Sequence, residues 1–110
     1  MQSAVEHADQ ANHAGVARRN FVMKCGGSTL PALPDSFFED LARLQSEGLQ
    51  PVIVHGGGPA ISDNLAKLGI ETEFIHGLRK TTEPVLDVVE MVLAGSINKQ
   101  IVRRIGMHGG

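Results

Sequence analysis

Hydrophobic residues in this chain are grouped either in short apolar runs or in longer segments where they recur every three or four positions. Two short runs, 21–23 and 52–54, are rich in β-branched or aromatic residues, which is typical of strands. Both faces of the 52–54 run are apolar, so we expect that strand to be buried on both sides. A short hairpin is predicted around Ile75-His76-Gly77, with Gly77 at positive φ in the turn.

Two of the longer segments have the spacing of amphipathic helices. The first is predicted to begin with Ser36 as N-cap, because Ser36 and Glu39 have capping-box spacing, and to end at Gly48 as a left-handed cap. The second is predicted to begin at Pro59, which suits the first turn of a helix, and to end at Gly69. The apolar face of this second helix is expected to consist of Ile61, Leu65 and Leu68.

A third helix is predicted from Glu83 to Ile105, with Thr81 or Thr82 as its N-cap. Its apolar residues cover more than one face. They are Val85, Leu86, Val88, Val89, Val92 and Leu93. We therefore expect this helix to pack on the sheet with one side and on a second partner with the other.

The order strand, helix, strand within about thirty residues indicates a βαβ unit, with parallel strands and a right-handed crossover. The fold class expected from the chain is therefore α/β. In such a sheet the carboxyl ends of neighbouring strands lie at one edge, which is where ligands bind in open α/β sheets. The loops that follow the two strands are thus expected to come together.

Both of these loops are rich in glycine. Gly56-Gly57-Gly58 separates a strand from a helix start, where unpaired amides and the helix dipole favour an anion. Lys24 at the end of the first strand, followed by Gly26-Gly27, is a second candidate anion loop, although it lacks the P-loop spacing. The alternative for each loop is a tight turn without a chemical role. Together they predict one anion-binding site at the edge of the sheet.

Composition restricts the class of protein. The chain has 110 residues, is 42% hydrophobic, and carries Lys+Arg 10 against Asp+Glu 12, so neither a nucleic acid nor an acidic membrane is indicated as partner. Cys25 is the single cysteine, which excludes an internal disulfide and fits a reducing, cytoplasmic location. Residues 1–19 are expected to be a disordered or weakly helical extension, in which His7 and His13 are too loosely spaced for a metal site.

Over residues 20–105 the chain resembles the amino-acid kinase family, and within it the acetylglutamate kinases. Four motifs in this order carry the resemblance: Lys24-Cys25-Gly26-Gly27, His55-Gly56-Gly57-Gly58-Pro59, Gly77-Leu78-Arg79-Lys80-Thr81 and Ala94-Gly95-Ser96-Ile97-Asn98-Lys99. The resemblance implies a three-layer α-β-α sandwich around a mainly parallel sheet, incomplete in this chain. Residues 20–110 would be the N-terminal part of the kinase domain, the part that binds the amino-acid substrate.

The resemblance also implies an activity and residue roles. The activity is ATP-dependent phosphorylation of the side-chain carboxylate of N-acetyl-L-glutamate, a step of arginine biosynthesis. Lys24 would stabilise the phosphoryl group in transfer, while Gly26 and Gly27 would contact nucleotide phosphate. Gly57 and Gly58 would hold the substrate through their amides, and Arg79 would bind its α-carboxylate. ATP would arrive with Mg²⁺, without a metal site in this chain.

Two features depart from the family pattern. His76 stands where acetylglutamate kinases usually have asparagine, so an aminoadipate derivative or aspartate is an alternative acceptor. Family members are also more than twice as long, and their second half supplies most of the nucleotide site. We therefore expect the chain to be inactive alone and to form a homodimer through the 83–105 helix. A non-catalytic carboxylate-binding or dimerisation module is the alternative function.

Overall fold

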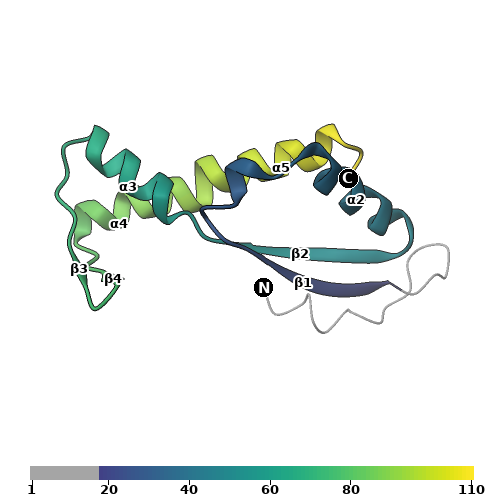
Figure 1. Ribbon diagram of the computed structural model, residues 1–110, viewed down its shortest axis with the longest axis horizontal. Coiled ribbons are helices and arrows are strands. Elements are labelled where there is room, and N and C mark those ends of the chain that lie inside the picture. The colour runs from purple at the N-terminus through teal and green to yellow at the C-terminus, as the bar shows by residue number, and fades with distance from the viewer. Residues whose placement is uncertain (1–17) are drawn as a thin grey trace.

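The structure is a computed structural model and describes residues 18–110 (Figure 1). Of the extension predicted over residues 1–19, residues 1–17 lie outside the described residues. Strands β1 (Arg19–Cys25) and β2 (Leu49–His55) pair in parallel, as predicted, and both are longer than the apolar runs from which they were predicted. Their register opposes Cys25 to His55, so the loops after these residues leave the sheet side by side.

Helices cover one face of this strand pair. Both α2 (Asp35–Ser46) and α5 (Asn98–Met107) lie on the same side of β1 and β2 (Figure 1). A short 3₁₀ helix, η1 (Leu30–Ala32), connects β1 to α2. The buried core of this part contains Phe38, Leu41 and Ile101, and the strand residues Met23 and Ile53 pack against it.

The opposite face of the strand pair is open in the described residues, which corrects the prediction of a strand buried on both sides. Val22 is 69% exposed and Val54 is 50% exposed. Side chains alternate along a strand, and the described helices α2 and α5 reach only one set of them. Both faces of the strands carry apolar side chains, but the described helices bury only those on one face.

The capping box predicted at Ser36 is wrong. The N-cap of helix α2 is Pro34, two residues before Ser36 and without a side-chain hydrogen bond, so the helix begins at Asp35. Pro34 has an extended backbone (φ −75°, ψ 163°), so the chain turns into the helix directly after it and Ser36 already lies in the first turn. The other end agrees with the prediction, because Gly48 follows the helix at φ 89°.

A second hydrophobic cluster joins α3 (Gly58–Lys67) to α4 (Glu83–Glu90), with Pro59 in the first turn of α3 as predicted. Its buried residues are Ile61, Leu65, Val85, Val88 and Val92. The prediction that Leu68 belongs to this core is wrong, because Leu68 is the C-cap and is 59% exposed. Ile70 takes its place and packs against the cluster.

The end of α3 explains this exchange. Gly69 has φ 69°, and it turns the chain back so that the Ile70 amide donates to the Leu65 carbonyl at 2.9 Å. The Gly69 amide donates to the Ala66 carbonyl at 3.1 Å. This pair of bonds is a Schellman motif, in which the residue after the glycine contacts the last turn of the helix. Helical periodicity therefore stops one residue before Leu68.

The helix predicted from Glu83 to Ile105 is present as one continuous helical run, but its centre is a π-helix. Helix α4 continues into the π segment η2 (Met91–Ile97) and then into α5, which ends at Met107. Thr82 is the N-cap, without a side-chain hydrogen bond. The expected packing is corrected: the first half lies on α3 and the second half on α2 and the strand pair, and Ile97 contacts both clusters.

The predicted hairpin is confirmed. Strands β3 (Phe74–Ile75) and β4 (Leu78–Arg79) are antiparallel, with His76 at φ 51° and Gly77 at φ 80° between them. Positive φ at both turn residues is the type I′ arrangement that two-residue hairpins favour. The hairpin lies beside α3 and α4, far from α2 (Figure 1).

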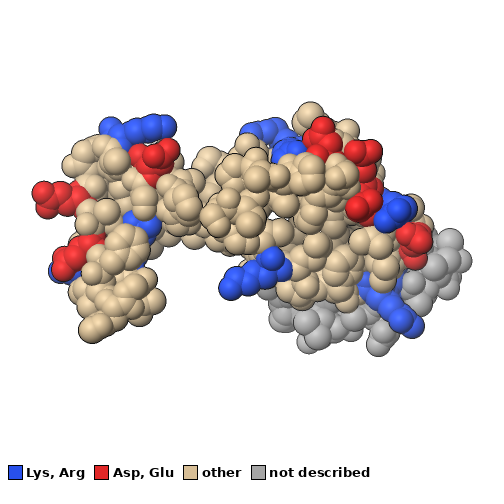
Figure 2. All heavy atoms as spheres, in the orientation of Figure 1, with Lys and Arg blue, Asp and Glu red and all other residues tan. Residues whose placement is uncertain are grey.

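The whole molecule is elongated, with extents of 53 × 29 × 22 Å. Its radius of gyration is 17.0 Å, against about 13 Å for a compact domain of this length. Charged side chains gather toward the two ends of the molecule, and the narrow middle carries few on the visible face (Figure 2). Among residues 18–110, each helix is too short or too polar to cross a lipid bilayer.

Candidate anion-binding site at the ends of two parallel strands

The two glycine loops meet directly beyond the ends of β1 and β2. The Gly56 amide donates to the Cys25 carbonyl at 3.3 Å and extends the parallel pairing into the second loop. A Cβ atom added to Gly27 would lie 2.7 Å from the Gly57 nitrogen and 3.1 Å from the Gly58 nitrogen. Real Cβ atoms do not approach backbone this closely, so Gly27 is required for the two loops to touch.

Two amides of this junction, those of Gly27 and Gly57, have no protein acceptor in the described part of the chain. None of the hydrogen bonds among residues 18–110 uses the Gly27 or Gly57 amide as donor, although Gly57 is buried. Gly58 is the first residue of α3, where amides have no partner within the helix. Buried amides in proteins are nearly always paired, and the positive end of the α3 dipole points to the same place. These groups together favour an anion.

The glycines differ in what surrounds them. A Cβ atom on Gly57 would lie 2.5 Å from Ile97 Cδ1 and 2.9 Å from Leu93 Cδ2, because the π segment passes directly over it. A Cβ atom on Gly58 would meet nothing within 4 Å, and one on Gly26 would meet only Thr29 Oγ1 at 3.8 Å. Gly27 is therefore required by packing against backbone, whereas a side chain at Gly57 would require the Ile97 and Leu93 side chains to shift, and Gly26 and Gly58 face open space in this structure.

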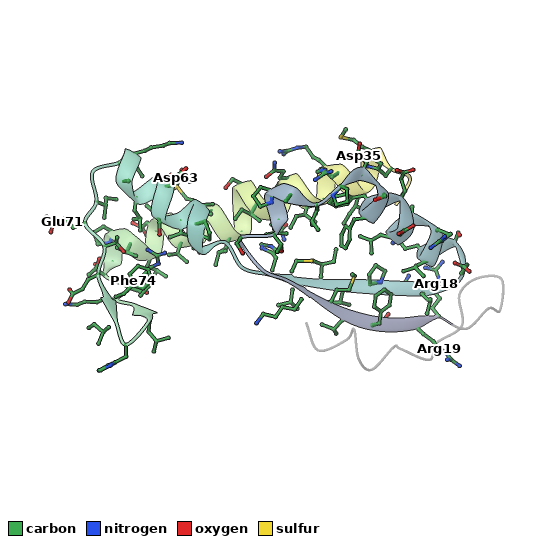
Figure 3. All side chains as sticks on the ribbon, viewed as in Figure 1. Arg18, Arg19, Asp35, Asp63, Glu71 and Phe74 are labelled. Atoms are coloured by element: carbon green, nitrogen blue, oxygen red, sulfur yellow. The ribbon has the colours of Figure 1, made fainter. Side chains whose placement is uncertain are left out.

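Arg79 reaches this junction from the hairpin. Its Nη2 donates to the Gly58 carbonyl at 3.3 Å and to Ser62 Oγ at 3.0 Å, and its Nη1 donates to Thr72 Oγ1 at 3.0 Å. The guanidinium also lies 4.7 Å from the ring centre of Phe74, which is labelled in Figure 3. All these partners are neutral, and no carboxylate of residues 18–110 pairs with Arg79. Its positive charge is thus left for an anionic group next to Gly58.

Lys24 lies apart from these groups. Lys24 opposes Val54 near the end of β1, and its exposed side chain forms no hydrogen bond or ion pair with residues 18–110. Met23 and Ile53 point to the helices, so by strand alternation Lys24 and Val54 point to the open face of the pair. The structure therefore brings Gly27, Gly57, Gly58 and Arg79 together and leaves Lys24 free at the edge of the same loop.

Two further side chains contact the site and were not predicted as site residues. Ser62 lies one helical turn after Gly58 and binds Arg79. Asn98 lies at the start of α5, and its Nδ2 is 3.5 Å from His55 Nε2. Asn98 belongs to the fourth of the motifs that carried the family resemblance, and it directly follows the π segment, which the sequence pattern did not show.

Cys25 is a packing residue, and the described part of the chain shows no cluster that could hold a metal ion. Cys25 is 7% exposed and packs at the end of β1, as expected of a small apolar side chain. Across residues 18–110, histidine, cysteine, aspartate and glutamate do not gather in groups of three that could hold a metal ion.

Comparison with known proteins agrees with the geometry. Residues 19–110 match the sequence model of the amino acid kinase family. The acetylglutamate kinase of Halalkalibacterium halodurans is 60% identical over 88 residues, which are 80% of this chain and 34% of that protein. The acetylglutamate kinase of Bacillus subtilis is 49% identical over 92 residues, 84% of this chain and 36% of that protein. The chain thus spans about a third of the length of the curated relatives it matches.

Solved structures show the same fold. The protein smu.665 of Streptococcus mutans superposes with a TM-score of 0.75 at 30% identity, over 82% of this chain and 37% of that one. The N-acetylglutamate synthase of Neisseria gonorrhoeae, solved with coenzyme A and N-acetyl-glutamate, superposes with a TM-score of 0.60 at 20% identity, over 94% of this chain and 23% of that one. These likenesses support the predicted α/β class with its parallel sheet. The described residues contain two parallel strands and the helices on one face of them.

Proposed function

Since this chain belongs to the amino acid kinase family, we propose that it is the acceptor-binding part of a kinase that phosphorylates the side-chain carboxylate of N-acetyl-L-glutamate, in arginine biosynthesis. One observation carries the proposal: at the ends of β1 and β2, two glycine loops with unpaired amides meet beside an arginine without a carboxylate partner. An acylated acidic amino acid has two carboxylates, and this junction offers two separate kinds of anion donor.

The two donors have different geometries. Arg79 presents a planar fork, which suits a carboxylate that stays unchanged during the reaction, and we assign it the α-carboxylate. The amides of Gly57 and Gly58 lie where two loops and a helix start converge, and we assign them the side-chain carboxylate that receives the phosphoryl group. The open space beside Gly58 leaves room for that group.

We assign the donor nucleotide to the other loop. Gly26 and Gly27 would contact phosphate oxygens of ATP, and Lys24 would stabilise the charge that develops on the phosphoryl group in transfer. The residues present fit the phosphate end of a nucleotide, because the Gly27 amide is unpaired and the Lys24 side chain, at the end of the strand that leads into this loop, is exposed. Mg²⁺ would arrive with the nucleotide and neutralise phosphate charge. Residues 20–110 are proposed as the substrate-binding part of the domain, in a cytoplasmic enzyme.

A second candidate is a non-catalytic module that binds a carboxylate and dimerises. The long helical run favours it, because several apolar side chains on this run are exposed. Leu86 is 53% exposed, Met91 58% and Val102 55%. Turnover distinguishes the two candidates: we expect this chain alone to give no ATP-dependent phosphorylation of N-acetyl-L-glutamate, whereas a complete kinase that contains it is active.

Ligand titration by NMR tests the acceptor site in the chain itself. We expect N-acetyl-L-glutamate to shift the Gly57 and Gly58 amide signals. N-acetyl-L-glutamine, which keeps only the α-carboxylate, should bind more weakly and shift them less. Arg79→Ala should weaken N-acetyl-L-glutamate binding about ten- to more than a hundredfold, the value of a charge-assisted contact of roughly 1.5–3 kcal/mol. Arg79→Lys should not restore it, because an ammonium lacks the fork.

The matched control is Arg103→Ala on α5, an exposed arginine outside the site, which should leave the affinity unchanged. Equal losses in the two variants, or amide shifts confined to other regions, would contradict the assignment. Parallel titrations with an N-acetylated aminoadipate and with aspartate decide between the alternative acceptors, because the ligand with the largest Gly57 and Gly58 shifts identifies the substrate class.

Lys24 is tested in a complete kinase that contains this chain. Lys24 would meet charge that appears only in the transition state, so Lys24→Ala should chiefly lower kcat, whereas Arg79→Ala should chiefly raise the KM for the acceptor. Steady-state kinetics with each substrate varied in turn separates the two. If Lys24→Ala raised KM alone, its assigned role would be wrong.

A further inference from the structure

A series of polar contacts leads from the helical run to the second glycine loop. Lys99 Nζ donates to Asn98 Oδ1 at 3.0 Å, Asn98 Nδ2 lies 3.5 Å from His55 Nε2, and His55 Nδ1 lies 3.1 Å from the Gly56 carbonyl oxygen. The middle contact is long for a hydrogen bond and the other two are of ordinary length. Asn98 and His55 are both half-buried, on α5 and at the end of β2.

The chemistry of the groups gives this series one direction. The ammonium of Lys99 has only donors, so the amide oxygen of Asn98 must face it, and the amide NH₂ then faces His55. His55 Nε2 must therefore be the ring nitrogen that accepts. A neutral imidazole with Nε2 unprotonated carries its proton on Nδ1, and the Gly56 carbonyl is the acceptor that Nδ1–H needs. Every donor in the series thus faces an acceptor.

The last contact bears on the Gly57 amide. The carbonyl of Gly56 and the amide of Gly57 belong to one planar peptide unit, and the described residues contain no cis peptide bond. In a trans peptide the C=O and the N–H point in opposite directions, so a bond that holds the Gly56 carbonyl also aims the Gly57 N–H. A peptide between two glycines needs such a restraint, because glycine backbone rotates at low steric cost and a flipped peptide would present its oxygen to an anion.

We propose that His55 and Asn98 are positioning residues that hold the Gly56–Gly57 peptide with its N–H directed into the anion site. His55 holds the Gly56 carbonyl, and Asn98, oriented by Lys99, holds the imidazole in the Nδ1–H tautomer. The identity of the anion rests on the function proposed above, whereas the orientation of the peptide does not. The π segment contributes by bringing Asn98 at its end over His55.

The ¹⁵N spectrum of the imidazole rings tests the tautomer in the unmutated chain. We expect His55 Nε2 to be unprotonated and Nδ1 to be protonated, with the signals assigned by their loss in His55→Phe. In Asn98→Asp the new carboxylate only accepts, so Nε2 should become protonated. Asn64→Asp, the same change at a half-buried asparagine that binds only the Ala60 carbonyl, should leave the His55 signals unchanged. A protonated Nε2 in the unmutated chain would overturn the proposed direction.

The orientation of the Gly57 N–H is measured without ligand by its residual dipolar coupling. We expect His55→Phe, which keeps a flat ring and loses both nitrogens, to change this coupling. The control is His108→Phe, since His108 Nδ1 also contacts a carbonyl, that of Arg104, at 2.8 Å, but at the far end of α5. This control should leave the Gly57 coupling unchanged. An unchanged coupling in His55→Phe would refute the positioning role, whatever ligand the site binds.

Binding then connects the peptide to the proposed function. His55→Phe should weaken N-acetyl-L-glutamate binding by roughly twofold to tenfold, the value of one ordinary hydrogen bond, and His108→Phe should not. If the coupling changes but N-acetyl-L-glutamate binds neither the variant nor the unmutated chain, the positioning role stands and the proposed substrate is wrong. If the ligand binds both histidine variants equally, His55 has no part in binding it.

Discussion

Single glycines in the two loops are present for different physical reasons. Gly27 and Gly57 lie where one loop touches the other or touches the helical run, so any side chain would collide with backbone or with Ile97 and Leu93. Gly26 and Gly58 have open space around the position of a Cβ atom. A glycine run in the sequence shows none of this difference, because the colliding atoms belong to distant segments.

Gly27→Ala is therefore expected to destabilise the chain, whereas Gly26→Ala is not. The added methyl group of Gly27→Ala would force the two loops apart, and overpacking of this kind costs about 1–3 kcal/mol in the free energy of unfolding. Gly26→Ala, in the same loop, places its methyl group 3.8 Å from Thr29 Oγ1 and should change that free energy by less than about 0.5 kcal/mol. Urea denaturation compares the two, and equal stability would show that the loops do not touch as described.

The residue at which a helix ends depends on its cap and its packing partners, and the end of α3 shows that this choice decides which side chains are buried. Leu65 and Leu68 have the same apparent place in the periodic pattern. The Schellman motif at Gly69 leaves Leu68 in solvent and returns Ile70 to the core. The burial of an apolar residue near a helix end thus depends on the turn that follows it.

The two leucines of α3 offer a matched pair. Leu65 is fully buried, so Leu65→Ala should lower the free energy of unfolding by about 2–5 kcal/mol through lost contacts and the cavity left behind. Leu68→Ala removes the same atoms from a side chain that is 59% exposed and should cost less than about 0.5 kcal/mol. Thermal or urea unfolding of both variants provides the measurement, and a large effect at Leu68 would place it in the core after all.

The turn of the hairpin, and not a contact with the substrate, accounts for the residue preference at position 76. His76 has φ 51°, a left-handed conformation that asparagine adopts more readily than histidine, and its side chain is exposed at the turn. An asparagine at this position would thus suit the turn itself. We expect His76→Asn to stabilise the hairpin by up to about 1 kcal/mol, and Gly77→Ala to destabilise it by about as much or more.

Hydrogen exchange of the Lys80 amide reports the stability of the hairpin, because this amide donates to the Glu73 carbonyl at 2.7 Å and closes the base. Exchange should slow in His76→Asn and accelerate in Gly77→Ala. If His76 instead contacts the substrate, His76→Asn should change the affinity for the ligand and leave the exchange of the Lys80 amide unchanged.

Within residues 18–110, two hydrophobic clusters are joined by one helical run. One cluster lies between α3 and α4, the other between the strand pair, α2 and α5, and Ile97 packs against both. Asp35, labelled in Figure 3 at the start of α2, forms an ion pair with Arg104 of α5 at 2.9 Å. This ion pair joins the two helices of the second cluster. Exposed apolar side chains along the run, Leu86, Met91 and Val102, are available for association.

We expect two copies of the chain to associate through this run, as proposed for the 83–105 helix. Met91→Glu should weaken the dimer at least about tenfold, because it removes an apolar contact and introduces a charge. Met107→Glu, at the end of α5 and 77% exposed, is the control and should leave the dimer intact. Val89 is unsuitable for this test because it is half-buried against the α3–α4 cluster. Sedimentation velocity is the measurement, and a monomer at micromolar concentration would contradict the prediction.

Local patterns in the sequence were sufficient for the kind and order of the elements. The two strands, the helices, the hairpin turn at Gly77 and the parallel pairing were predicted from residues close to one another along the chain, because strand and helix periods, glycine turns and the βαβ rule are short-range properties. The meeting of the two glycine loops followed from the parallel pairing alone.

Tertiary structure decided the properties that depend on contacts between distant segments. It determined that Ile70 replaces Leu68 in the core and that one face of the strand pair stays open. The contact of Asn98 with His55 joins residues 43 positions apart, and the π segment that precedes Asn98 packs over Gly57. Burial and side-chain partners depend on atoms far away in the sequence, and a local pattern contains no information about them.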